Sequence, residues 1–180
     1  NNAARRMWGL NRWDEVLARG ARKVWGFASD DCHDVRDERK FDRGWILVKS
    51  QINPQDCRQG LVDPDALRRD MLENIRGGNF WAVVRRRGRR GGSGRGDDGP
   101  WPVISHDQGQ IHVTADRPCE TIEFHAGSSS HRQSTSASGS AAFAYDIGGW
   151  EDYVRVSVIQ KREDGQCLVA FSQPLCVRRE

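Results

Sequence analysis

A stretch of low complexity divides this chain and limits the folds open to it. Residues 85–100 read RRRGRRGGSGRGDDGP, a Gly- and Arg-rich run typical of a solvated linker or an expanded loop. The residue patterns on its two sides differ, so we place a domain boundary there. We therefore expect two units, residues 1–84 and 101–180, instead of one continuous core.

The first half of the chain begins with a helix signal and a strand signal. Asn11 can cap a short helix that Gly20 closes. Residues 22–28 then read as a buried strand. The run Trp45-Ile46-Leu47-Val48 reads as the next strand, and because it is apolar throughout it favours a parallel sheet covered on both faces.

A second helix and strand complete the first half. Asp63-Pro64 is a strong helix start, with Asp63 as the cap and Pro64 at the first helical position. Gly77-Gly78 ends this helix, and residues 79–84 read as a strand. Helix and strand signals that alternate predict an α/β unit over residues 1–84.

The second half has a different pattern. Short stretches with alternating apolar residues recur at 111–113, 121–125, 143–147, 153–159 and 168–171. Clusters of Gly, Ser, Asp and Pro separate them, and the Ser-rich residues 128–140 read as a loop. This pattern predicts a small antiparallel β-sandwich of about six strands over residues 101–180.

Composition narrows the classes of partner. The net charge is +3, but the block 85–95 alone carries six arginines, so the rest of the chain carries −3. A general nucleic-acid-binding surface is therefore not indicated, although the Arg-Gly block leaves salt-sensitive binding of RNA backbones as an alternative. No apolar run approaches the roughly 18 residues that span a bilayer, so no membrane partner is expected. The five cysteines are scattered, odd in number and without a Cys-x-x-Cys pair, which favours reduced thiols and a cytoplasmic setting.

The residues with the most chemical content follow the apolar run that begins at Val24. This run leads into Asp30, Asp31 and His33, and a strand that ends in an Asp-x-His pair is an arrangement by which α/β barrels hold catalytic metals. Carboxylate and neutral imidazole suit zinc or manganese, and Asp30 is placed to orient His33 or a neighbouring backbone amide. The alternative is an ordinary polar loop in which an Asp caps the next turn.

These pieces, in their order, resemble a known family. Asn11–Asp14, Leu17–Gly20, Val24–His33, Gly44–Val48 and Gly78–Ala82 together resemble the C-terminal part of a PHP domain, the polymerase and histidinol phosphatase family. The resemblance covers residues 1–84, and a trailing β-sandwich is compatible with it. It implies part of a distorted α/β barrel, a site for divalent zinc, manganese or iron, and hydrolysis of phosphate esters. It also implies that Asp31 and His33 are metal ligands; no other catalytic residue is assigned.

The family pattern is incomplete in this sequence. The family opens with a His-x-His motif, whereas no histidine precedes His33 here. One hypothesis is a C-terminal fragment or degenerate copy of a metal-dependent phosphoesterase. It would act on a phosphorylated small molecule once an N-terminal barrel half supplied the other ligands. The alternative is a non-catalytic module whose sandwich contacts protein or glycan.

The remaining histidines are interpreted as ordinary surface residues. Alternation places His112 and His125 on the outward faces of their strands, away from the expected barrel. His106 and His131 are expected in loops.

Overall fold

The computed structural model describes residues 10–19, 24–29, 44–86, 102–128, 130–161, 165 and 167–176. Within these ranges it contains three helices and eight strands. The helices are α1 (Leu10–Ala18), α2 (Pro54–Arg58) and α3 (Pro64–Gly77). The strands are β1 (Gly44–Val48), β2 (Phe80–Arg86), β3 (Val103–Asp107), β4 (Gln110–Gly127), β5 (Arg132–Asp146), β6 (Tyr153–Lys161), β7 (Cys167–Ser172) and β8 (Leu175–Cys176).

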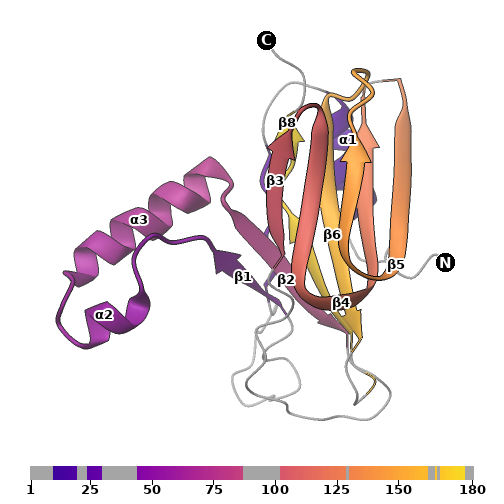
Figure 1. Ribbon diagram of the computed structural model, residues 1–180. Coiled ribbons are helices and arrows are strands. Elements are labelled where there is room, and N and C mark those ends of the chain that lie inside the picture. The colour runs from indigo at the N-terminus through magenta and orange to yellow at the C-terminus, as the bar shows by residue number, and fades with distance from the viewer. Residues whose placement is uncertain are drawn as a thin grey trace.

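All eight strands belong to one antiparallel sheet that folds over itself. The strand order is β1-β2-β7-β6-β4-β3, with β5 paired to β4 and β8 paired to β6. The long strand β4 pairs with β3 through its first half and with β6 through its second half, and its register with β5 shifts between Thr114 and Cys119. This irregularity bends β4, so that one strand contributes to both layers of a sandwich-like fold (Figure 1).

The main core lies between these two layers. Ile122 and Phe124 from the second half of β4 are fully buried, and Ile111 and Val113 from its first half belong to the same cluster. The ring of Phe124 packs against Tyr145, with centroids 5.5 Å apart. Each such apolar side chain contributes roughly 1.5–3 kcal/mol through burial, so this cluster holds the layers together.

The predicted α/β barrel is wrong, and so is the parallel sheet expected at residues 45–48. Strand β1 pairs antiparallel with β2, and all five of its residues are only half-buried. Helix α3 has no buried residue and stands away from the sheet instead of covering it (Figure 1). An apolar run indicates burial but does not show whether the neighbouring strands run parallel or antiparallel, which is why the parallel sheet was predicted wrongly.

Strands from both sides of the predicted linker share the sheet. Strand β2 pairs with β7 from Trp81 opposite Ser172 to Arg86 opposite Cys167. Of the predicted linker 85–100, the structure describes only residues 85 and 86, which end β2. The fold is therefore all-β and sandwich-like, with the helices as additions to the sheet.

Local signals gave mixed results for the helices. Asp63 caps α3 by accepting a hydrogen bond from the Asp65 amide at 3.0 Å, and Gly78 ends it in the left-handed conformation, as predicted. Helix α1 starts at Leu10, so Asn11 lies inside the helix and is not its cap. No helix in the described ranges is both long and apolar enough to cross a membrane.

Candidate functional site

The predicted metal ligands Asp31 and His33, and the neighbouring Asp30, lie outside the described residues. The segment directly before them, residues 24–29, is described. It is not the strand that the sequence predicted but a segment without regular secondary structure. Its contacts therefore show what holds the chain directly before the Asp-x-His pair.

A side chain near the C-terminal end of the sheet binds this segment. The Gln173 amide accepts a hydrogen bond from the Gly26 amide at 2.8 Å and donates one to the Gly26 carbonyl at 2.9 Å. Gln173 is only 4% exposed, so both bonds are shielded from water. Its side chain thus satisfies the backbone of Gly26 as a neighbouring strand would.

Aromatic contacts fix the segment along its length. The Trp25 indole donates a hydrogen bond to the Arg76 carbonyl at 3.1 Å, and the Phe27 ring stacks on Phe80 with centroids 4.8 Å apart. A Cβ added at Gly44, the first residue of β1, would lie 2.7 Å from the Ser29 carbonyl oxygen, so the two backbones touch. The segment therefore ends against the start of β1.

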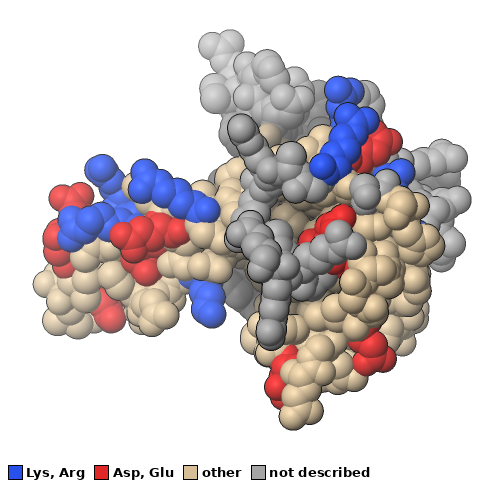
Figure 2. Space-filling view, turned by 90° about the horizontal axis from the view of Figure 1, so that it is seen from above, with Lys and Arg blue, Asp and Glu red and all other residues tan. Residues whose placement is uncertain are grey.

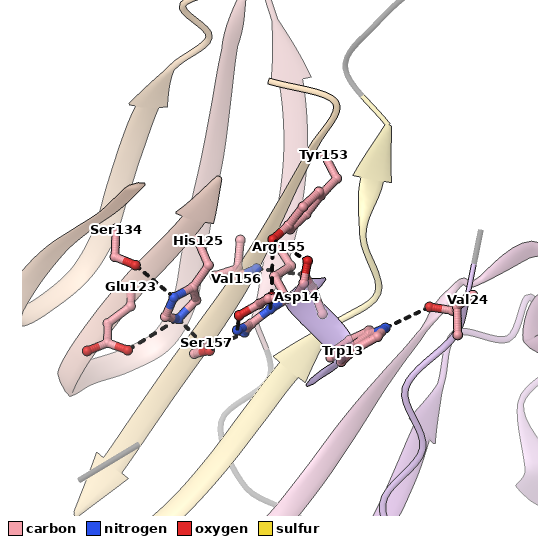
Figure 3. A network of polar contacts seen from close by, with 11 residues as sticks. Trp13, Asp14, Val24, Glu123, His125, Ser134, Tyr153, Arg155, Val156 and Ser157 are labelled. Carbon is pink, nitrogen blue, oxygen red and sulfur yellow. Dashed lines mark hydrogen bonds and ion pairs between the residues drawn. The ribbon is translucent and has the colours of Figure 1, made fainter. Parts of the chain in front are cut away.

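Helix α1 is bound to the sheet by a polar network shown in Figure 3. Arg155 on β6 donates two hydrogen bonds to the Asp14 carboxylate, from Nε at 2.6 Å and from Nη2 at 2.7 Å. Tyr153 donates to the same carboxylate at 3.3 Å, and its burial, together with the Asp14 charge, raises the pKa of its hydroxyl. Trp13 packs its ring against the Arg155 guanidinium and donates to the Val24 carbonyl at 2.8 Å, which links α1 to the segment 24–29.

His125 extends this network across the outer face of the sheet. Its Nδ1 lies 3.1 Å from the Ser134 hydroxyl, and its Nε2 lies 3.1 Å from the Ser157 hydroxyl and 3.3 Å from a Glu123 oxygen (Figure 3). The alternation prediction is right about the face, because the neighbouring Phe124 lies in the core. The side chain is nevertheless only 16% exposed, so it is not a free surface histidine.

A buried carboxylate closes the loop between β5 and β6. Glu151 accepts hydrogen bonds from the Tyr145 hydroxyl at 2.7 Å and from the Gly148 amide at 2.9 Å. Burial alone raises the pKa of the Glu151 carboxyl, but these bonds, together with the backbone amides of Glu151 and Gly149, outweigh burial and hold it below its ordinary value. Burial and the same carboxylate raise the pKa of Tyr145. The carboxylate is thus a structural anion that orders the turn.

The sequence did not indicate a cavity of about 660 Å³ at the edge of the sandwich. Lys49, directly after β1, and His106, on β3, both contribute to its lining. His106 lies in a strand and not in the predicted loop, and it pairs with the core residue Ile111. Only pairing between elements far apart in the chain brings these two basic side chains to one cavity.

Metal ligands do not cluster among the described residues: these ranges contain no group of three or more His, Cys, Asp or Glu side chains that could hold a metal ion. Any such site would need residues outside those ranges.

Comparison with known proteins adds no assignment. No protein-family model matches the chain, and no curated protein or solved structure shows significant similarity to it.

Proposed function

We propose that this chain is part of a metal-dependent phosphoesterase, in which Asp31 and His33 bind a divalent cation. The observation that carries the proposal is the anchoring of residues 24–29. Gln173, Phe80 and helix α1 all hold this short segment, although it has no regular secondary structure of its own. Such anchoring fixes the described end of the segment, Ser29, against the start of β1, and the Asp-x-His sequence follows Ser29 in the chain.

The chemistry assigned to these residues is limited. Asp31 and His33 would supply an oxygen and a nitrogen ligand to zinc, manganese or iron. A bound cation of this kind lowers the pKa of a coordinated water and offsets the charge of a phosphate ester. A multinuclear site needs further ligands, and the described ranges contain no group of three or more His, Cys, Asp or Glu side chains that could form one by itself. The substrate class is a phosphorylated small molecule.

Metal titration of the 180-residue chain tests the ligand assignment. We expect Mn²⁺ or Zn²⁺ to bind, and we expect Asp31→Ala and His33→Ala each to weaken binding at least about tenfold, because even residues that only orient a ligand change metal affinity by that much. Isothermal titration calorimetry measures the affinity. Asp37→Ala, which removes a carboxylate from the same charged stretch, is the matched control and should bind as the parent does.

Two results would contradict the proposal. Equal metal affinities for the Asp31, His33 and Asp37 variants would contradict the assignment of Asp31 and His33 as metal ligands. A longer protein that contains this chain, binds Mn²⁺ and leaves p-nitrophenyl phosphate intact would remove the phosphoesterase assignment while keeping the metal site.

The second candidate is a non-catalytic interaction module, and the helical arm formed by α2 and α3 favours it. Neither helix has a buried residue, and Leu61, which lies between them, is 71% exposed. Met71 and Leu72 on α3 are exposed as well. Acidic and basic side chains interleave over the arm (Figure 2). Exposed apolar residues with a polar rim are typical of protein-contact surfaces. A chain that purifies and functions without stoichiometric metal would favour this candidate.

A further inference from the structure

The cavity at the edge of the sandwich shares two lining residues, Phe80 and Gln173, with the contacts that hold residues 24–29. Lys49, directly after β1, lines the cavity, whereas Ser29 lies against Gly44 at the opposite end of that strand. A ligand in the cavity would not need Asp31 or His33, so its binding can be tested separately from the proposed phosphoesterase function.

Both layers of the sheet contribute to the cavity. Leu47 and Trp81, which are register partners, come from the β1–β2 layer. Ile104 and His106 come from β3, opposite the buried Val113 and Ile111 of β4, so they face the core side of their layer. The cavity is thus a gap in the packing between two core-facing surfaces.

The walls of the cavity are apolar but incompletely covered. Trp81, Ile104 and Leu175 pack against the main core, yet each stays partly exposed. Val103 at the rim is 63% exposed. A volume of about 660 Å³ lies within the range of roughly 300–1,000 Å³ that is usual for small-molecule sites, and a largely apolar lining is usual for them too.

The ionisable groups that line the cavity are basic, and its other polar side chains are neutral. Lys49 and His106 are its only ionisable side chains among the described lining residues, and none of these is Asp or Glu. Gln173 and Ser172 already bond to the backbone of Gly26 and Val156. In contrast, the side chains of Lys49 and His106 form no hydrogen bond or ion pair with any described residue, which leaves both groups able to bind a ligand.

We infer that this cavity binds a small organic anion, with its apolar body between Trp81, Ile104 and Leu175 and its carboxylate at Lys49 and His106. The apolar walls supply the area that a ring or short alkyl chain buries. The basic groups at the rim supply a charge-assisted contact that a neutral analogue lacks.

A matched pair of ligands tests this inference on the 180-residue chain. We expect 4-phenylbutanoate to bind more tightly than its neutral analogue 4-phenylbutanamide in isothermal titration calorimetry. Lys49→Met should weaken the binding of the carboxylate about three- to fivefold and leave that of the amide unchanged. Val103→Glu, which adds an acidic group at the rim, should also weaken the binding of the carboxylate. Both positions are exposed, so neither substitution disturbs the core.

Lys161→Met provides the control. Lys161 is the exposed last residue of β6 and does not line the cavity, so its substitution should leave both affinities unchanged. Binding should also quench tryptophan emission, and Trp81→Phe should remove the quenching while the heat of binding persists.

The inference is overturned if neither compound binds, if acid and amide bind equally, or if Lys161→Met matches Lys49→Met. Quenching that survives in Trp81→Phe would also overturn it, because the ligand would then lie elsewhere.

Discussion

At the scale of single residues, the fold depends on two charged side chains that it buries with their partners. Arg155 is 2% exposed and directs two hydrogen bonds to Asp14, while Glu151 accepts hydrogen bonds from Tyr145 and Gly148. A buried charge is tolerated only where its partners replace the water that it loses. Each residue is therefore a point where one substitution has a large and specific effect.

Arg155→Met should lower the free energy of unfolding by about 2–4 kcal/mol, because it leaves the mostly buried Asp14 carboxylate unpaired. Chemical denaturation in urea measures the change. The double variant Asp14→Leu/Arg155→Met should recover much of the loss, since it removes both charges. Arg68→Ala is the control: its ion pair with Asp65 is 76% exposed on the Arg68 side and should contribute less than about 1 kcal/mol. A loss as large for Arg68→Ala would refute the argument from burial.

Glu151 makes stability depend on acid pH. Its pKa is lower in the folded state than its ordinary value of 4.5, so its contribution is complete above that value and is lost as the pH falls below it. We expect Glu151→Gln to flatten the fall in melting temperature below about pH 4.5. Glu73→Gln on the exposed face of α3 serves as control and should keep the parent profile. An unchanged profile in Glu151→Gln would contradict the assignment.

At the scale of elements, the segment 24–29 shows how irregular backbone is held. Gly26 is satisfied by the Gln173 side chain, and a Cβ there would lie 2.8 Å from the Trp13 ring. The sequence predicted a strand from the apolar run, but the bonding partner of this backbone is a side chain and not another strand. Nothing in the pattern around Gly26 could reveal that.

Gln173→Leu should release this segment. It removes both hydrogen bonds and leaves the Gly26 amide and carbonyl unsatisfied, at a cost of about 1–3 kcal/mol. Hydrogen exchange of the Gly26 amide should accelerate more than exchange in β6. Gln133→Leu, an exposed glutamine on β5, should change neither. Uniform acceleration across the sheet would instead indicate global destabilisation.

Other elements show which signals are local enough to read. Asp63, Pro64 and Gly78 mark α3 because a helix satisfies its own backbone and ends through residues within the same segment. The predicted strands at 111–113 and 121–125 form one strand, β4. Pro118 lies where the register with β5 shifts, and a strand can continue through a proline at such an irregularity. The Ser-rich residues 132–140, expected in a loop, form part of β5 because pairing with β4 outweighs their preference for turns.

At the scale of the whole molecule, pairing between distant segments decided what the sequence could not. The apolar run at β1 suggested a parallel sheet, but its antiparallel neighbour β2 pairs onward with β7. The same long-range pairing places Lys49 and His106 around one cavity. The sequence could therefore predict where many elements lie, but neither their order in the sheet nor this candidate site.

The pairing of β2 with β7 also has a consequence for biosynthesis. A ribosome releases β1 and β2 well before it reaches Ser172, the register partner of Trp81. Until then, Trp45 to Val48 on β1 can pair only with a strand, β2, whose other edge has no partner. Sheets that are completed by pairing between distant segments form slowly. The nascent chain should therefore expose the unpaired edge of β2 until translation passes β7.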